Sequence, residues 1–81
     1  MRTKIDNIEQ LKVMAKELGT VEAYIVLNGG FRSSKDIQYD GREWHILHGI
    51  DDVYETFDSD EKMLTQTNIG AAFNSGALFA Y

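Results

Sequence analysis

Residues 34–50 have the sequence SKDIQYDGREWHILHGI, which predicts a β-hairpin and decides the fold. Apolar and polar residues alternate on both sides of Asp40-Gly41, a dipeptide that favours a two-residue type I′ turn between strands 34–39 and 42–50. Pairing across this turn sets Ile37 opposite Trp44. It also sets Tyr39 opposite Arg42. The alternation then buries one face of the hairpin and leaves the other in solvent. The residues expected inside are Ile37, Trp44 and Ile46, and those expected outside are Asp36, Gln38, Glu43 and His45.

The segments before the hairpin predict a helix and a central strand. Apolar residues recur at helical period over residues 7–18, where Asp6 and Glu9 form a capping box and Gly19 is a C-terminal stop. Residues 21–27 are almost continuously apolar and rich in β-branched side chains, which is typical of a strand in the middle of a sheet.

The segments after the hairpin predict one more strand, two short helices and a last strand. Residues 53–57 form the strand, and the capping-box pattern of residues 58–61 opens a helix that ends near Leu64. Thr67 caps a second helix, Gly76 ends it, and residues 77–81 form the final strand. The order is therefore α-β-β-β-β-α-α-β. This order predicts a single α+β domain over residues 1–81, with the N-terminal helix and the short C-terminal helices on a mainly antiparallel sheet of four to five strands.

The composition indicates a folded, cytoplasmic protein. Among 81 residues, 43% are hydrophobic, which is enough for one core but not for two. The chain contains no cysteine for a disulfide framework, and its first residues lack the apolar run of a signal peptide, so we expect a cytoplasmic location. No apolar run is long enough to cross a membrane. Because a core of this size stabilises a domain only modestly, a homodimer is one expected source of further stability.

The charges are divided unevenly along the chain. Of the eight basic residues seven precede Glu43, whereas from Glu43 onward seven acids face Lys62 alone, a net charge of −6. An acidic field repels nucleic-acid backbones, so direct nucleic-acid binding is not expected. A protein with a basic surface fits this field better.

The glycine-rich stretch at residues 28–35 allows two interpretations. A strand that leads into glycines, hydroxyls and cations can direct backbone N–H groups toward an anion. The candidate anion-binding residues are Gly29, Gly30, Arg32, Ser33 and Lys35. The spacing is not that of a P-loop, and a strand follows where a phosphate site would have a helix. The alternative interpretation is a plain turn before a polar strand.

The two histidines do not predict a metal site or an enzyme. On a strand, His45 and His48 point to opposite faces and cannot readily bind one ion. The predicted hairpin sets Asp36 opposite His45, a pair that could act as a general base but is more often a surface contact. No nucleophile motif accompanies it. We therefore expect no catalytic residues, no metal and no cofactor.

The acidic segment after the hairpin is the candidate partner-binding site. Six acids occur within residues 51–61, at a spacing that differs from an EF-hand loop. Val53, Tyr54 and Phe57 lie among them, and aromatic anchors with an acidic rim are typical of a surface that docks a basic protein. Tyr54 is expected on the solvent face of its strand. The candidate partner-binding residues are Asp51, Asp52, Tyr54, Glu55 and Asp58. The alternative interpretation is a series of solvated turns and caps.

Five short motifs resemble small uncharacterised accessory proteins of bacteriophages and prophages. They are Leu27-Asn28-Gly29-Gly30-Phe31-Arg32-Ser33-Ser34-Lys35, Tyr39-Asp40-Gly41, Ile50-Asp51-Asp52, Thr67-Asn68-Ile69-Gly70 and Gly76-Ala77-Leu78-Phe79-Ala80-Tyr81. The resemblance implies a setting in which the protein binds and inhibits or redirects a host enzyme, for example one that processes nucleic acid or acts in defence. The alternative function is a small-ligand or nucleotide binder that uses the turn at residues 29–35.

Overall fold

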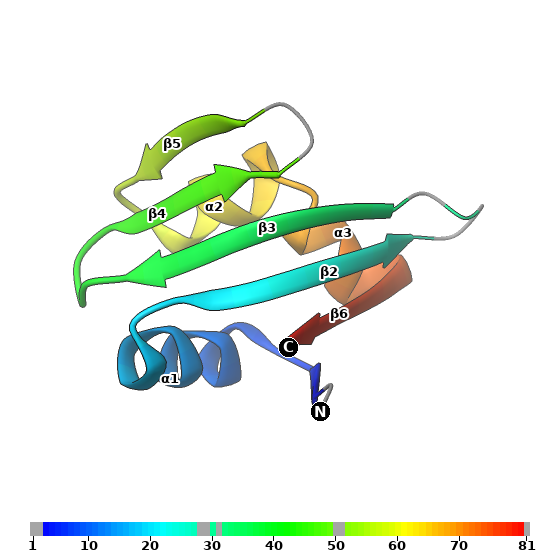
Figure 1. The fold of residues 1–81 in the computed structure, drawn as a ribbon, viewed down its shortest axis with the longest axis horizontal. Coiled ribbons are helices and arrows are strands. Elements are labelled where there is room, and N and C mark those ends of the chain that lie inside the picture. Colours follow the sequence, from blue (N-terminus) through cyan, green and yellow to red (C-terminus); the bar gives the residue numbers. More distant parts are fainter. Residues whose placement is uncertain (1–2, 28–29, 31, 50–51, 81) are drawn as a thin grey trace.

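Six strands form one antiparallel sheet, and three helices pack on one face of it (Figure 1). The computed structural model describes residues 3–27, 30, 32–49 and 52–80. The elements are, in chain order, β1 (Thr3–Ile5), α1 (Ile8–Leu18), β2 (Val21–Leu27), β3 (Arg32–Tyr39), β4 (Trp44–His48), β5 (Val53–Phe57), α2 (Asp60–Gln66), α3 (Ile69–Ser75) and β6 (Gly76–Ala80). The strands lie in the order β1-β6-β2-β3-β4-β5. The predicted α+β class is confirmed, with six strands in place of four to five.

One hydrophobic core lies between the sheet and the helices. In β2, alternate residues Val21, Ala23 and Ile25 are buried, as strand geometry requires when only one face is covered. Each helix contributes apolar side chains to the same core, for example Leu11 from α1 and Met63 from α2. Trp44 is fully buried in it, as are Ile37 and Ile46, which the sequence predicted to share this face.

The hairpin register differs from the prediction. Tyr39, not Ile37, lies opposite Trp44, and Ile37 lies opposite Ile46. The predicted type I′ turn is wrong because Asp40 does not have a positive φ, and residues 40–43 form a longer loop in which Gly41 has φ of 97°. The register moves by two residues, and a shift of two keeps every side chain on its face. The buried set was therefore predicted correctly from a wrong register.

The chain ends form an additional strand pair. Thr3 lies opposite Ala80 and Ile5 opposite Leu78, so β1 borders β6 at one edge of the sheet. Three residues give no recognisable periodicity, and β1 was missed. The final strand was predicted to end with Tyr81, but it spans Gly76–Ala80 and residue 81 lies outside the described part.

The N-cap of each helix lies one residue after the predicted one. Asn7, not Asp6, is the N-cap of α1, and its side chain accepts the Gln10 N–H at 2.9 Å. Asp6 instead donates its N–H to the Gln10 side chain. In α2, which runs to Gln66 and not Leu64, the N-cap is Ser59. Asn68, not Thr67, is the N-cap of α3, although the Thr67 hydroxyl accepts the Ile69 N–H at 3.2 Å.

A polar cluster joins two helices to the hairpin at the border of the core. The Trp44 indole N–H donates to Asp60 Oδ1 at 3.0 Å, and Lys12 Nζ lies 2.6 Å from Asp60 Oδ2. Lys12 also lies over the Tyr39 ring, 5.6 Å from its centroid. Burial opposes the Asp60 charge, but the hydrogen bonds from Lys12 and Trp44 outweigh it and lower the Asp60 pKa. This cluster fixes α1 and α2 against β3 and β4.

Candidate functional site

The sheet face opposite the helices, which we call the open face, carries no described element (Figure 1). Cross-strand pairs identify its side chains, because residues opposite one another on neighbouring strands share a face. Glu22 pairs with Asp36, which pairs with Leu47, which pairs with Tyr54. Aromatic, aliphatic and acidic side chains therefore lie side by side across four strands. Other residues on this face are Tyr24, Val26, Gln38, His45, Thr56 and Phe79.

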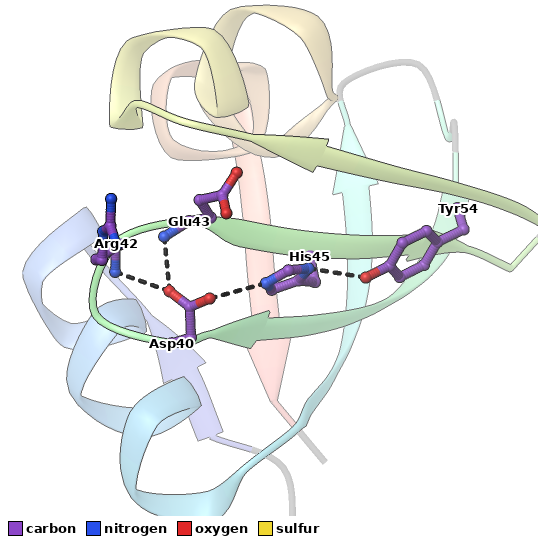
Figure 2. A network of polar contacts seen from close by, with 5 residues as sticks. All are labelled: Asp40, Arg42, Glu43, His45 and Tyr54. Atoms are coloured by element: carbon purple, nitrogen blue, oxygen red, sulfur yellow. Dashed lines mark hydrogen bonds and ion pairs between the residues drawn. The ribbon is translucent and has the colours of Figure 1, made fainter.

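A hydrogen-bonded chain crosses the open face from the hairpin loop to β5 (Figure 2). Asp40 Oδ1 accepts the N–H groups of Arg42 and Glu43 at 2.8 and 2.7 Å. Asp40 Oδ2 lies 3.1 Å from His45 Nε2, and His45 Nδ1 lies 2.7 Å from the Tyr54 hydroxyl. A carboxylate only accepts, so Nε2 carries the proton. In the neutral imidazole, Nδ1 then accepts from the Tyr54 O–H. We call this chain the Asp40–His45–Tyr54 relay.

The electrostatics of the relay centre on Asp40. The Glu43 N–H, the His45 ring and the Arg42 N–H hold the pKa of the Asp40 carboxyl well below its usual range. Asp40 is therefore ionised at neutral pH and fixes the orientation of the His45 ring. Because the His45 ring is held in one orientation, its Nδ1 atom is a fixed hydrogen-bond partner for the Tyr54 hydroxyl.

Tyr54 combines exposure with a fixed position. Its side chain is 61% exposed, and it is the one aromatic residue among the exposed large hydrophobic residues of the described surface. Its ring lies beside the His45 ring, with centroids 6.2 Å apart and planes 24° from parallel. Most exposed side chains exchange rotamers freely, but here the relay attaches the far end of Tyr54 to the neighbouring strand. Tyr54 is thus presented to solvent in a restrained orientation.

Two shallow hollows lie on the open face beside the relay, and both include Asp36. One, of about 240 Å³, is bordered by Thr20, Asp36, Gln38, His45, Leu47 and Tyr54. The other, of about 290 Å³, lies over β2 and β3, where Glu22, Tyr24, Ser34 and Lys35 join Asp36. From β2 to β5 the described charged side chains on this face are those of Glu22 and Asp36. A ligand or partner over these two hollows therefore meets the carboxylates of Glu22 and Asp36.

The described members of the predicted partner-binding set lie on both faces of β5 and at its two ends. Tyr54 lies on the open face, while Asp52 and Asp58 are exposed at the two ends of β5. Glu55 points to the helix side, where it lies 2.8 Å from His48 Nε2. Phe57 is 5% exposed and belongs to the core, so it cannot anchor a partner as expected. Asp51 lies outside the described residues.

Two of the predicted anion-binding residues are buried in the structure. Ser33 and Lys35 are 6% and 5% exposed, and alternation places both on the helix side of β3. Lys35 Nζ contacts His48 Nδ1 at 2.6 Å. Gly30 donates its N–H to Leu27 O. Gly29 lies outside the described residues, as does the side chain of Arg32. Burial withdraws the Ser33 and Lys35 side chains from solvent, and the anion-binding site as a whole stays a prediction.

The predicted pair of Asp36 and His45 is also wrong. The register sets Gln38 opposite His45, and the carboxylate that contacts His45 is that of Asp40. His45 and His48 lie on opposite faces, as predicted from strand alternation. His48 lies within ion-pair distance of Glu55, but the alignment is too poor for a hydrogen bond from Nε2. Within residues 3–27, 30, 32–49 and 52–80, no three acidic or histidine side chains are arranged to hold a metal ion.

The relay was missed by reasoning from the sequence. Asp at the first position of a hairpin loop is a known signal for side-chain capping of the following N–H groups. Alternation also places His45 and Tyr54 on one face once the strands are recognised. What joins them is the register of β4 with β5, in which Leu47 is opposite Tyr54 and His45 is opposite Thr56.

The fold and site define a class of protein: an α+β domain whose antiparallel sheet is covered on one face and open on the other. Comparison with models of protein families, with curated proteins and with solved structures found no match to this chain. No helix in the described part of the chain is long and apolar enough to cross a membrane. The function must therefore be inferred from the open face itself.

Proposed function

We propose that this protein binds another protein through the open face around Tyr54 and that the partner's contacting surface is basic. The observation that carries the proposal is the restrained exposure of Tyr54. Aromatic anchors provide much of the affinity at protein interfaces, and an anchor fixed before binding loses little conformational entropy on association. The Asp40–His45–Tyr54 relay supplies that restraint.

The charge distribution supports a basic partner. Asp36 lines the hollow beside Tyr54, Glu22 lines the neighbouring hollow together with Lys35, and Asp52 and Asp58 flank the Tyr54 strand. Acids around an interface accelerate encounter with a basic surface and disfavour acidic competitors. The net charge of −5 extends this effect to the whole molecule.

The biological setting is part of the proposal and rests on the sequence resemblance. A small acidic accessory protein of a bacteriophage would use such a surface to bind a host protein in the bacterial cytoplasm and to inhibit or redirect it. An enzyme that handles nucleic acid fits the charge argument, because such enzymes carry basic surfaces. An open face with acidic hollows would then occupy the surface that the nucleic acid uses.

Affinity capture from a bacterial lysate with matched variants tests the proposal. We expect a protein that the wild type retains and that Tyr54→Ala loses, with an affinity lower by about 2 kcal/mol or more, roughly 30-fold. Val13 on α1 is 53% exposed and far from the open face in the fold, so Val13→Ala is the control and should retain the partner. Equal capture by wild type and Tyr54→Ala would contradict the proposal.

A further inference from the structure

The strand that carries Tyr54 is an edge strand with free pairing capacity. β5 is the last strand in the sheet order, and no described strand lies beyond it (Figure 1). Its sequence, VYETF, is rich in β-branched and aromatic residues and contains no proline or glycine. Natural edges are often protected by prolines, lysines or bulges, because an open edge pairs with other extended chains. β5 has none of these protections.

The hydrogen-bonding phase of the sheet identifies the backbone groups at this edge. Gly49 N–H donates to Ser34 O at 2.8 Å, which makes this a hydrogen-bonded pair between the strands of the hairpin. Such pairs alternate in antiparallel sheets, so Leu47 and His45 also bond toward β3. Trp44, Ile46 and His48 then bond toward β5.

The same alternation continues into β5. The partners of Trp44, Ile46 and His48 are Phe57, Glu55 and Val53, whose backbone groups are therefore used within the sheet. The N–H and C=O groups of Tyr54 and Thr56 point the other way, out of the sheet edge. An added strand would hydrogen-bond to these two residues.

The charges around β5 select the kind of strand that fits. Two copies of β5 paired about a twofold axis would set Glu55 opposite Glu55 and Asp52 opposite Asp58, with like charges facing each other. Like charges directly opposite each other are destabilising in sheets. A strand with basic residues opposite Asp52 and Asp58 is favoured instead. Lys62 lies 3.1 Å from Asp58 in an exposed ion pair, which a competing cation on the added strand can replace.

We propose, on the basis of the protein-binding function above, that the partner contributes an extended basic segment which pairs with the outer edge of β5. Antiparallel pairing fixes its pattern. Two apolar residues, two positions apart, lie opposite Tyr54 and Thr56 on the open face, and basic residues lie two positions beyond each, opposite Asp52 and Asp58. The recognised pattern is basic-x-apolar-x-apolar-x-basic, where x faces the helix side.

The probe is the blocked heptapeptide Lys-Thr-Val-Thr-Val-Thr-Lys, with Glu-Thr-Val-Thr-Val-Thr-Glu as its matched control. Amide hydrogen exchange of the wild-type protein is followed by NMR with each peptide at millimolar concentration. In the free protein the Tyr54 and Thr56 amides should exchange rapidly and those of Val53, Glu55 and Phe57 slowly. The lysine peptide should slow exchange at Tyr54 and Thr56, whereas the glutamate peptide should leave it unchanged.

Thr56→Pro removes one outward N–H without removing a bond between β4 and β5. Thr56→Pro should lower the affinity for the lysine peptide about tenfold. Thr56→Val, which keeps the N–H, should bind this peptide with an affinity within about twofold of wild type. Slow exchange at Glu55 in the proline variant verifies that the sheet is intact. If the proline variant does not fold, the amide exchange of the wild-type protein with the two peptides still tests strand addition.

The outcomes separate this inference from the proposed function. Unchanged exchange at Tyr54 and Thr56 with the lysine peptide overturns strand addition, even if Tyr54→Ala loses a captured partner and the proposed function stands. A wild-type dimer in sedimentation that Thr56→Pro dissociates overturns the choice of occupant, because the edge would then pair with a second copy. If strand addition is seen but no Tyr54-dependent partner is captured, the proposed function fails, while the pairing of a basic segment with the edge of β5 is retained.

Discussion

Asp40 joins the hairpin loop to the open face through a single carboxylate. One oxygen accepts the N–H groups of Arg42 and Glu43 in the loop, and the other orients His45. Because the same side chain supports the loop and the relay, a change at Asp40 affects both the local fold and the position of Tyr54.

The pH dependence of stability should report on Asp40. Its pKa is lowered in the folded protein, chiefly by the Glu43 N–H and then by His45 and the Arg42 N–H. A group with a lowered folded pKa stabilises the fold above its unfolded pKa of about 4 and loses that contribution as the pH falls through the folded pKa. Urea unfolding should therefore show wild type to be more stable than Asp40→Asn at pH 5, with a difference that shrinks below about pH 4. A difference independent of pH down to 2.5 would contradict the role of the charge.

The two short helices meet at a contact that leaves no room for a side chain. Thr67 donates its hydroxyl to Met63 O at 2.6 Å and accepts the Ile69 N–H, which turns the chain from α2 into α3. Gly70 then passes so close to α2 that a Cβ built on it would lie 2.5 Å from Leu64 O. The glycine permits the close approach of one helix to the other.

Gly70→Ala should destabilise the protein by about 1–3 kcal/mol, because the added methyl meets backbone and the helices must separate. The sign of the change in the free energy of unfolding tests this contact, because alanine in place of an unconstrained helical glycine stabilises a protein by about 1 kcal/mol. Thermal or urea unfolding measures the effect. Asn74→Ala, an exposed change in the same helix, should alter stability little and serves as the control.

The elements were largely predictable, and the contacts that build the site were not. The helical period of residues 7–18 and the apolar run of residues 21–27 depend on local patterns, and both predictions are confirmed. Burial of Trp44 followed from alternation alone, which is insensitive to a register shift of two. The relay needs the true register of two strand pairs and the side-chain cap at Asp40. β1 forms only because β6, from the far end of the chain, supplies its partner.

The charge of the whole molecule bears on its oligomeric state. The open edge of β5 is available to a second copy, and in a twofold pair the opposing acids, together with the net charge of −5, resist it. The acids that would face each other are Asp52, Glu55 and Asp58.

Removing two of these charges should therefore allow self-association. We expect Asp52→Asn combined with Asp58→Asn to form dimers in sedimentation experiments in which the wild type stays monomeric. Adding Thr56→Pro should restore the monomer, because it removes an outward N–H from the pairing edge. Dimers that persist with Thr56→Pro would show that association uses another surface.

The position of β6 in the sheet also determines when the protein can fold during its synthesis. β6 is synthesised after the five other strands, yet it lies between β1 and β2 and pairs with both. Until it emerges, β1 has no neighbour, β2 has one unpaired side and the core lacks Leu78. The six-stranded sheet can therefore be complete only after residues 76–80 have emerged from the ribosome.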